Sequence, residues 1–231
     1  RWRVWLEEEV SPIISSEQRA AFLALESEAQ RQAFFERLWV YWGQQSGYGS
    51  AFRRMYEERL QLARSDFDST TEDRARVLLI HGFPDGRLVP RCAEVFVPVE
   101  IWTWQYLEGL GEGVVVLFYQ PGGMGRFRLW NPMEGRERLY TFDGWQARLA
   151  TTSRFDQPEL SCFDGDTVLR LITAAEYWLK DPRTLEAMHH QPTPRGTGRE
   201  ESASARFVEF SALLDEGAEP LALEVASSPR G

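Results

Sequence analysis

The chain has 231 residues, of which 43% are hydrophobic and 13% aromatic, so it can bury a substantial core. Its formal net charge is −9 and its basic residues form no concentrated cluster, which argues against a nucleic-acid partner. No apolar run approaches the roughly 18 residues of a membrane span, so we expect no spanning segment in this sequence.

The first third of the chain is predicted to be helical. Ser15 with Gln18, and Ser27 with Gln30, have the spacing of capping boxes, which satisfy free N–H groups at a helix start. Apolar residues then recur every three or four positions, which indicates helix faces turned toward a core rather than a cofactor site. The two stripes are Phe35, Leu38, Trp39 and Trp42, followed by Phe52, Met55, Tyr56, Leu60 and Ala63.

From Arg74 onward the pattern changes to short apolar runs and alternation, which is typical of strands. The expected strands are Val77–Ile80, Val95–Trp102, Val114–Tyr119 and Phe127–Trp130. Pro98 has no N–H to donate to a β-ladder, so its strand is predicted at a sheet edge or a bulge.

The segment Gln120–Gly125 is rich in glycine and is expected to join the last two strands as a hairpin connection. It lacks the Gly-Lys-Ser/Thr ending of a phosphate-binding loop, and a strand pattern follows it instead of a helix. We therefore expect no phosphate site and no cofactor there.

A second helical patch follows the sheet, and Asp181-Pro182 is expected to restart the chain after it. The shared face of this patch comprises Val168, Leu171, Ile172, Ala175 and Trp178 or Leu179. Together these patterns predict an α+β fold over residues 1–190, with N-terminal amphipathic helices packed on a mainly antiparallel sheet and further helices after it. Residues 191–205 are predicted to be a linker, and residues 206–231 the start of a truncated C-terminal β-rich region.

Two cysteines, Cys92 and Cys162, can form at most one disulfide, and they lie too far apart in the chain for a local metal knuckle. The sequence leaves open whether they meet in space. We expect two free buried thiols.

An enzymatic alternative starts from His81, Gly82 and Pro84. Many α/β-hydrolases use a strand that ends in His-Gly-x-Pro to place backbone donors near a developing oxyanion. That fold also needs a nucleophile, normally within Gly-x-Ser-x-Gly, and no such pentad occurs in the sequence. The other histidines, His189 and His190, have no obvious acidic orienting residue nearby. An interior strand followed by a turn is therefore favoured over a catalytic site.

The acidic run Asp66–Asp73 raises the question of a metal site. It carries four acids in eight residues, but it lacks the central glycine and the distant glutamate of a calcium loop. A solvated acidic turn is the favoured interpretation, and no metal ligand is predicted.

Four segments carry a family resemblance, namely Phe34–Trp39, Asp73–Val77, Gly82–Asp85 and Glu100–Trp104. In this order they resemble the GWxTD-domain family of bacterial proteins, over about residues 2 to 130. In that family a helical Phe-x-x-x-x-Trp pattern precedes Gly-Trp-x-Thr-Asp, a basic strand, Gly-Pro-Pro-Asp and Glu-x-Trp-x-Tyr. Where the signature pentad is expected, this chain has Ser69–Asp73 and keeps only the aspartate and an adjacent small polar residue.

The resemblance implies an exported bacterial protein, periplasmic or envelope-associated, with an α+β module followed by a β-rich region. It carries over no reaction, cofactor or catalytic residue. The leading hypothesis is thus a non-catalytic module that assembles with other envelope proteins or with its own C-terminal β domain.

The speculative interaction surface comprises Trp102, Trp104, Trp130, Arg126 and Arg128. A second hypothesis is a glycan or peptidoglycan platform, in which the tryptophans stack on sugar rings and the arginines hold acidic groups. It requires at least two exposed, roughly coplanar indoles. Otherwise the indoles simply pack beneath the helices. An esterase remains the third hypothesis.

Overall fold

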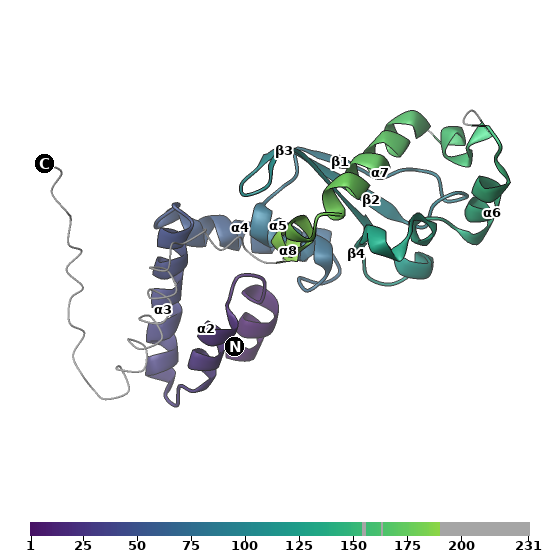
Figure 1. Ribbon diagram of the computed structural model, residues 1–231. Helices are drawn as coiled ribbons and strands as arrows, with labels where there is room; N and C mark the ends of the chain where they lie inside the picture. The colour runs from purple at the N-terminus through teal and green to yellow at the C-terminus, as the bar shows by residue number, and fades with distance from the viewer. Residues whose placement is uncertain (154–155, 163, 190–231) are drawn as a thin grey trace, which may run out of the picture. The chain divides into compact units, whose positions relative to one another are not determined.

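The computed structural model describes residues 1–153, 156–162 and 164–189. These residues divide into two compact units. The first contains Arg1–Ile13 and the described residues from Met55 onward, and the second contains Ile14–Arg54. Figure 1 shows the helices and the sheet. The predicted linker and the predicted C-terminal β region lie outside the described residues.

The second unit contains α2 (Ser16–Leu23), α3 (Glu28–Gln45) and the start of α4 (Ala51–Asp66). Both capping boxes are confirmed, because the Ser15 and Ser27 side chains accept hydrogen bonds from the backbone N–H groups of Gln18 and Gln30. The predicted apolar faces are buried, apart from Phe35 and Met55, which are partly exposed. Phe34 is buried in place of Phe35 and packs edge-on against Phe22 at 5.5 Å.

The first unit begins with a short helical segment, α1 (Trp2–Val4) followed by the π-helical turn η1 (Trp5–Glu9). It is tied to the later part of α4 by two contacts. The Tyr56 hydroxyl donates to the Glu9 carbonyl at 2.7 Å, and Arg64 pairs with the Glu9 carboxylate at 2.5 Å.

The strand predicted at Val77–Ile80 is wrong, because these residues belong to helix α5 (Asp73–His81). A four-residue apolar run fits a fully buried helix as well as a buried strand, and all four side chains here are buried. Gly82 ends the helix with a φ of +81°, a value that favours glycine. From α4, Arg59 donates to the carbonyls of Leu79 and Ile80 and so caps the last turn.

The sheet is four-stranded and antiparallel, in the order β1-β2-β3-β4, which confirms the predicted α+β class. Its strands are β1 (Gly86–Leu88), β2 (Val99–Leu107), β3 (Gly111–Tyr119) and β4 (Arg128–Leu129). The residues Val114–Tyr119 are all buried, so both faces of β3 are covered. Helix α7 (Gly165–Leu179) packs on β3 and β2 and crosses the sheet (Figure 1).

The observed strands differ from the predicted ones in two further ways. β2 begins at Val99 and not at Val95, so Pro98 precedes the ladder, and Phe96 forms only an isolated bridge with Tyr140. The short edge strand β1 was missed. The hairpin connection between β3 and β4 is confirmed, and its Gly122, Gly123 and Gly125 all adopt positive φ.

The remaining elements of the first unit are 3-10 turns and helices. These are the 3-10 turns η2 (Pro121–Gly123), η3 (Pro132–Glu134), η4 (Arg136–Leu139) and η6 (Pro158–Ser161), with helices α6 (Phe142–Ala150), α7 and α8 (Pro182–His189). α8 starts at the predicted Pro182 and packs on α5.

The expectation of two free thiols is wrong, because Cys92 and Cys162 form a disulfide with their Cα atoms 5.3 Å apart. The bridge joins the loop before β2 to the residue that follows η6. A separation of 70 residues hides this proximity in the sequence.

Candidate functional site

The three predicted indoles lie inside the protein. Trp102, Trp104 and Trp130 are all buried, so they cannot offer the exposed stacking faces that a glycan platform requires. Each indole N–H is satisfied internally. Trp102 donates to Glu100, Trp104 to the Phe83 carbonyl at 3.1 Å, and Trp130 to the Gly135 carbonyl at 3.2 Å. The prediction of an exposed tryptophan surface is therefore wrong, because all three indoles are packed inside the protein.

His81 occupies the C-terminal end of α5, where its Nε2 lies 2.8 Å from the Ala187 carbonyl of α8. A carbonyl oxygen only accepts, so Nε2 carries the proton. Burial lowers the pKa of His81 to about 4, so the imidazole is neutral near pH 7. The ring is thus part of the contact between two helices, not of the oxyanion loop considered in the esterase alternative.

A buried ionic network lies beside Trp102. The Glu100 carboxylate accepts from Nη1 of Arg74 at 2.9 Å, from Nε and Nη2 of Arg87, and from the Trp102 indole. Because both oxygens are satisfied by several donors, the charge is well compensated. Neither Glu100 nor Arg74 was singled out in the sequence, since a buried salt bridge between residues 26 positions apart leaves no local pattern.

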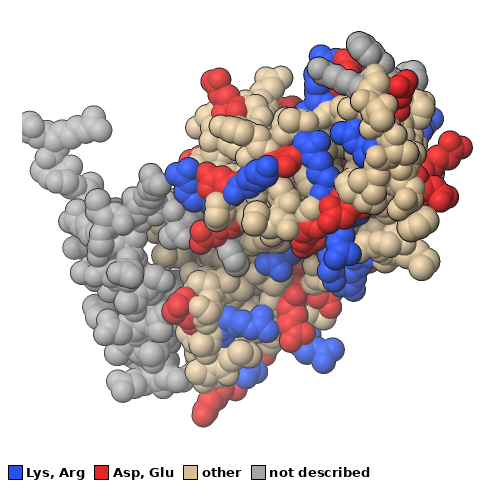
Figure 2. All heavy atoms as spheres, turned by 45° about the vertical axis from the view of Figure 1, so that its right-hand side comes forward, with Lys and Arg blue, Asp and Glu red and all other residues tan. Residues whose placement is uncertain are grey.

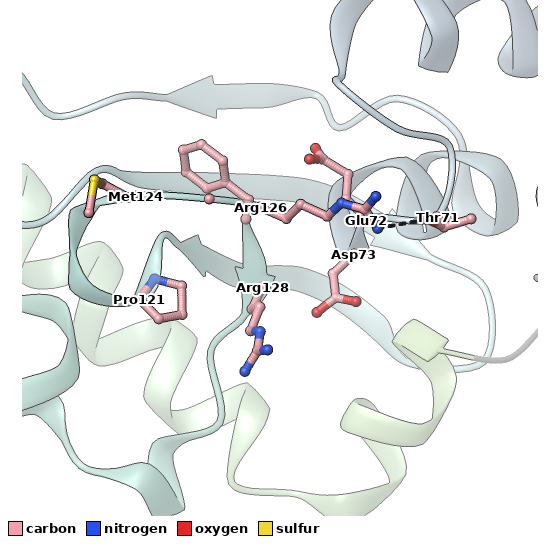
Figure 3. A pocket seen from close by; sticks show the side chains of 9 residues that line it. Thr71, Glu72, Asp73, Pro121, Met124, Arg126 and Arg128 are labelled. Atoms are coloured by element: carbon pink, nitrogen blue, oxygen red, sulfur yellow. Dashed lines mark hydrogen bonds between the residues drawn. The ribbon is translucent and has the colours of Figure 1, made fainter.

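The two predicted arginines, Arg126 and Arg128, line a pocket of about 510 Å³ (Figure 3). One wall is the segment that leads into α5, and the other is the connection from β3 to β4. The lining residues are Thr71, Glu72, Asp73, Pro121, Met124, Gly125, Arg126, Phe127 and Arg128. The tryptophans and arginines that were predicted as one surface are therefore separated, with the arginines outside and the indoles inside.

Arg126 and Arg128 differ from Arg74 and Arg87 of the buried network in the partners of their guanidinium groups. Arg126 donates to the Thr71 hydroxyl at 3.1 Å, and Arg128 extends on the same side as Asp73 in Figure 3. Neither forms an ion pair with any residue that the structure describes. The Asp73 carboxylate instead accepts from the backbone N–H of Leu129 at 2.7 Å and so holds β4 against the start of α5.

Glu72 links the pocket to the network. Its Oε1 accepts from Nε of Arg74 at 2.8 Å, whereas its Oε2 is buried without a hydrogen-bond partner in the described residues. Burial raises the pKa of Glu72, although the Arg74 charge opposes the shift. Arg74 also lies over the Phe127 ring at 3.7 Å, and Phe127 lines the pocket.

The acidic run does not converge on one point. Asp66 pairs with Arg87 at 3.7 Å, Glu72 with Arg74, and Asp73 with the β4 backbone. Among the described residues there is no group of three or more histidine, cysteine or acidic side chains arranged to hold a metal ion. The described residues also contain no helix that is long and apolar enough to cross a membrane.

Of the residues that line the pocket, the sequence analysis predicted only Arg126 and Arg128 as part of a binding surface. The only local signal was a methionine within a glycine-rich loop that precedes two arginines. Comparisons of this chain with protein-family models, with curated proteins and with solved structures found no match.

Proposed function

We propose that this chain is a non-catalytic interaction module of the bacterial envelope, and that it binds an acidic segment of a partner protein at the Arg126–Arg128 pocket. The proposal rests on two properties of Arg126 and Arg128, their exposure at the rim of a pocket and their lack of a carboxylate partner in the described residues.

The chemistry of the rim favours a protein partner. Arginine is enriched at protein interfaces because its planar fork binds carboxylates through two hydrogen bonds and is weakly hydrated. Met124, which lines the same pocket, is 80% exposed, and methionine is also enriched at interfaces because it adapts to irregular surfaces. Acidic side chains with an adjacent apolar residue would complement both features.

The disulfide supports a location outside the cytoplasm. Disulfides such as Cys92–Cys162 persist in oxidising compartments and are rare in cytosolic proteins. This agrees with the envelope location implied by the resemblance to the GWxTD-domain family, which remains part of the proposal.

The test is site-specific photo-crosslinking in the cells that produce the protein. A benzophenone amino acid replaces Met124 in one variant and Tyr177 in a control, because Tyr177 is similarly exposed, at 76%, but is not among the residues that line the pocket. We expect an adduct from position 124 and none of comparable yield from position 177. An adduct of twice the chain mass would identify a second copy as the partner.

A charge reversal tests whether the arginines carry the interaction. Arg126→Glu with Arg128→Glu should abolish the adduct, whereas Arg91→Glu, at another exposed arginine, should leave it unchanged. Melting curves check that the variants fold, and because the rim arginines are exposed we expect stability changes within about 0.5 kcal/mol. Equal adducts from both positions, or an adduct that survives the double reversal, would overturn the proposal.

A further inference from the structure

A second hollow, of about 490 Å³, lies in the first unit among η4, α6, η6 and α7. Its distinguishing feature is three arginines from three different elements: Arg136 of η4, Arg148 of α6 and Arg170 of α7. This hollow shares no lining residue with the Arg126–Arg128 pocket.

Each of the three arginines is oriented by its own carboxylate. Arg136 pairs with Glu176, Arg170 with Asp166 at 3.1 Å, and Arg148 with the buried Glu159 at 3.4 Å. Glu159 is itself fixed by the Tyr140 hydroxyl, which donates to Oε1. Glu176 and the buried Glu159 therefore hold Arg136 and Arg148 in place before any ligand arrives, whereas Arg170 is held only by an exposed pair.

These ion pairs do not use up the donors of the guanidinium groups. Arg136 binds through Nε and Nη2, and Arg170 also binds through Nε and Nη2. The pair between Arg148 and Glu159 is made at Nε. In the hydrogen bonds that the structure describes, Nη1 of Arg136, Nη1 of Arg170 and both Nη atoms of Arg148 are unused. An oxyanion that accepts several hydrogen bonds matches this set of donors.

The rest of the lining indicates what the anion is attached to. Leu160 and Leu169 add apolar surface, and a hollow of this volume is in the range of small-molecule sites. On the face shown in Figure 2, basic and acidic side chains are interspersed and no large field of one sign is formed. Recognition in the hollow would depend on local donors rather than on long-range attraction of any polyanion, because each lining arginine is already paired with a carboxylate.

We propose that this hollow binds a small organic oxyanion, a phosphate or carboxylate joined to a compact apolar group. The anionic oxygens contact Arg136, Arg148 and Arg170, and the apolar group lies on Leu160 and Leu169. This inference is independent of the proposed protein interaction, because it concerns different residues and a different class of ligand.

The experiment uses the full chain and four probes. Phenyl phosphate and benzoate each carry an oxyanion and a ring, inorganic phosphate carries only the anion, and benzyl alcohol carries only the ring. We expect saturable binding of at least one ring-bearing anion with a Kd of about 1 mM or tighter, by calorimetry or NMR titration. Phosphate should bind more weakly and benzyl alcohol not measurably. The preference between phenyl phosphate and benzoate distinguishes the two anion chemistries.

Two matched variants test the arginines. The side chains of Arg170 and Arg183 are 74% and 77% exposed, and each pairs with a nearby aspartate, but only Arg170 lines the hollow. Arg170→Gln should weaken binding roughly tenfold, the effect of losing one charge-assisted hydrogen bond. Arg183→Gln should change the binding affinity less than about twofold, because Arg183 does not line the hollow. Since both variants lose the same charge, the comparison separates a local contact from the effect of net charge.

Three results would overturn the inference. The first is the absence of saturable binding for both ring-bearing anions. The second is equal weakening by Arg170→Gln and Arg183→Gln, which would indicate diffuse attraction by net charge. The third is equal binding of benzyl alcohol, which would show that the arginines contribute nothing. Since both substituted residues are exposed, the fold is retained and the comparison stays interpretable.

Discussion

Glu100 and Glu159 are both buried carboxylates in the first unit, but their surroundings differ. Both oxygens of Glu100 receive hydrogen bonds from Arg74, Arg87 and Trp102. Glu159 accepts from Tyr140 and pairs with Arg148 through one oxygen, while its Oε2 has no hydrogen-bond partner in the described residues.

The difference shows two uses of a buried charge. Around Glu100 both carboxylate oxygens receive hydrogen bonds, and the network joins α5 to β1 and β2. The Glu159 carboxylate holds Arg148 at the edge of the second hollow and leaves the Nη donors of Arg148 unused. A closed network stabilises the fold, whereas an open arrangement leaves groups for a ligand.

The largest expected effect is at Glu100. Glu100→Gln leaves the buried Arg74 and the partly exposed Arg87 without their shared negative charge, so we expect a loss of about 3–5 kcal/mol in the free energy of unfolding. Urea denaturation measures it. Glu112→Gln is the matched control, because Glu112 lies on the paired strand β3 but is exposed. A loss at Glu100 no larger than the loss at Glu112 would contradict a closed, stabilising network.

The next effect is at the disulfide, which holds the segment around Glu159 to the loop before β2. Cys92→Ser with Cys162→Ser should lower the free energy of unfolding by ~2–4 kcal/mol, because the bridge restricts the unfolded chain over a long loop. A reducing agent should lower the stability of the wild type by a similar amount and leave the double variant unchanged. If reduction has no effect on the wild type, the bridge contributes nothing to stability.

A smaller effect is expected at Glu159 itself. In Glu159→Gln the amide oxygen can still accept from Tyr140, the cost of burying a charge is removed, and Arg148 remains partly hydrated. We expect a change below about 1 kcal/mol in the free energy of unfolding, measured by the same denaturation. Losses of equal size at Glu159 and Glu100 would remove the distinction between the two surroundings.

The last prediction concerns the pH dependence of Glu72, which resembles Glu159 in that only one of its carboxylate oxygens is satisfied. Burial raises the pKa of Glu72 in the folded protein, so its contribution to stability is present below the unfolded pKa near 4.5. The contribution is lost as the pH rises through the folded pKa. As the pH falls from neutral toward 4.5, wild type should therefore gain stability relative to Glu72→Gln. Parallel stability curves for the two proteins would contradict this assignment.

Local features were predicted well because their causes are local. The capping boxes at Ser15 and Ser27 and the glycine-rich connection after β3 each depend on residues a few positions apart. The run Val77–Ile80 was misjudged because four consecutive apolar residues carry no period, and only the neighbouring elements show that a helix is buried there. Helix-favouring residues such as Arg74 and Ala75 were a usable signal.

The candidate site was predicted only in part. Arg126 and Arg128 were singled out and do line a pocket, but the grouping with three tryptophans fails because the indoles are buried in the core whereas the arginines are exposed. Thr71 and Glu72 reach the same pocket from a segment about 50 residues earlier in the chain. That proximity has no counterpart in local sequence.

The amino-acid sequence by itself determined the α+β class, the starts of α2, α3 and α8, and the hairpin, since these follow from propensity, capping and turn chemistry within short windows. Only the tertiary structure decided that Cys92 meets Cys162, that Glu100 gathers two arginines and that two hollows are lined by arginines. The physical reason is that burial and ionic pairing depend on which distant segments pack together, and that choice is made by the whole core at once.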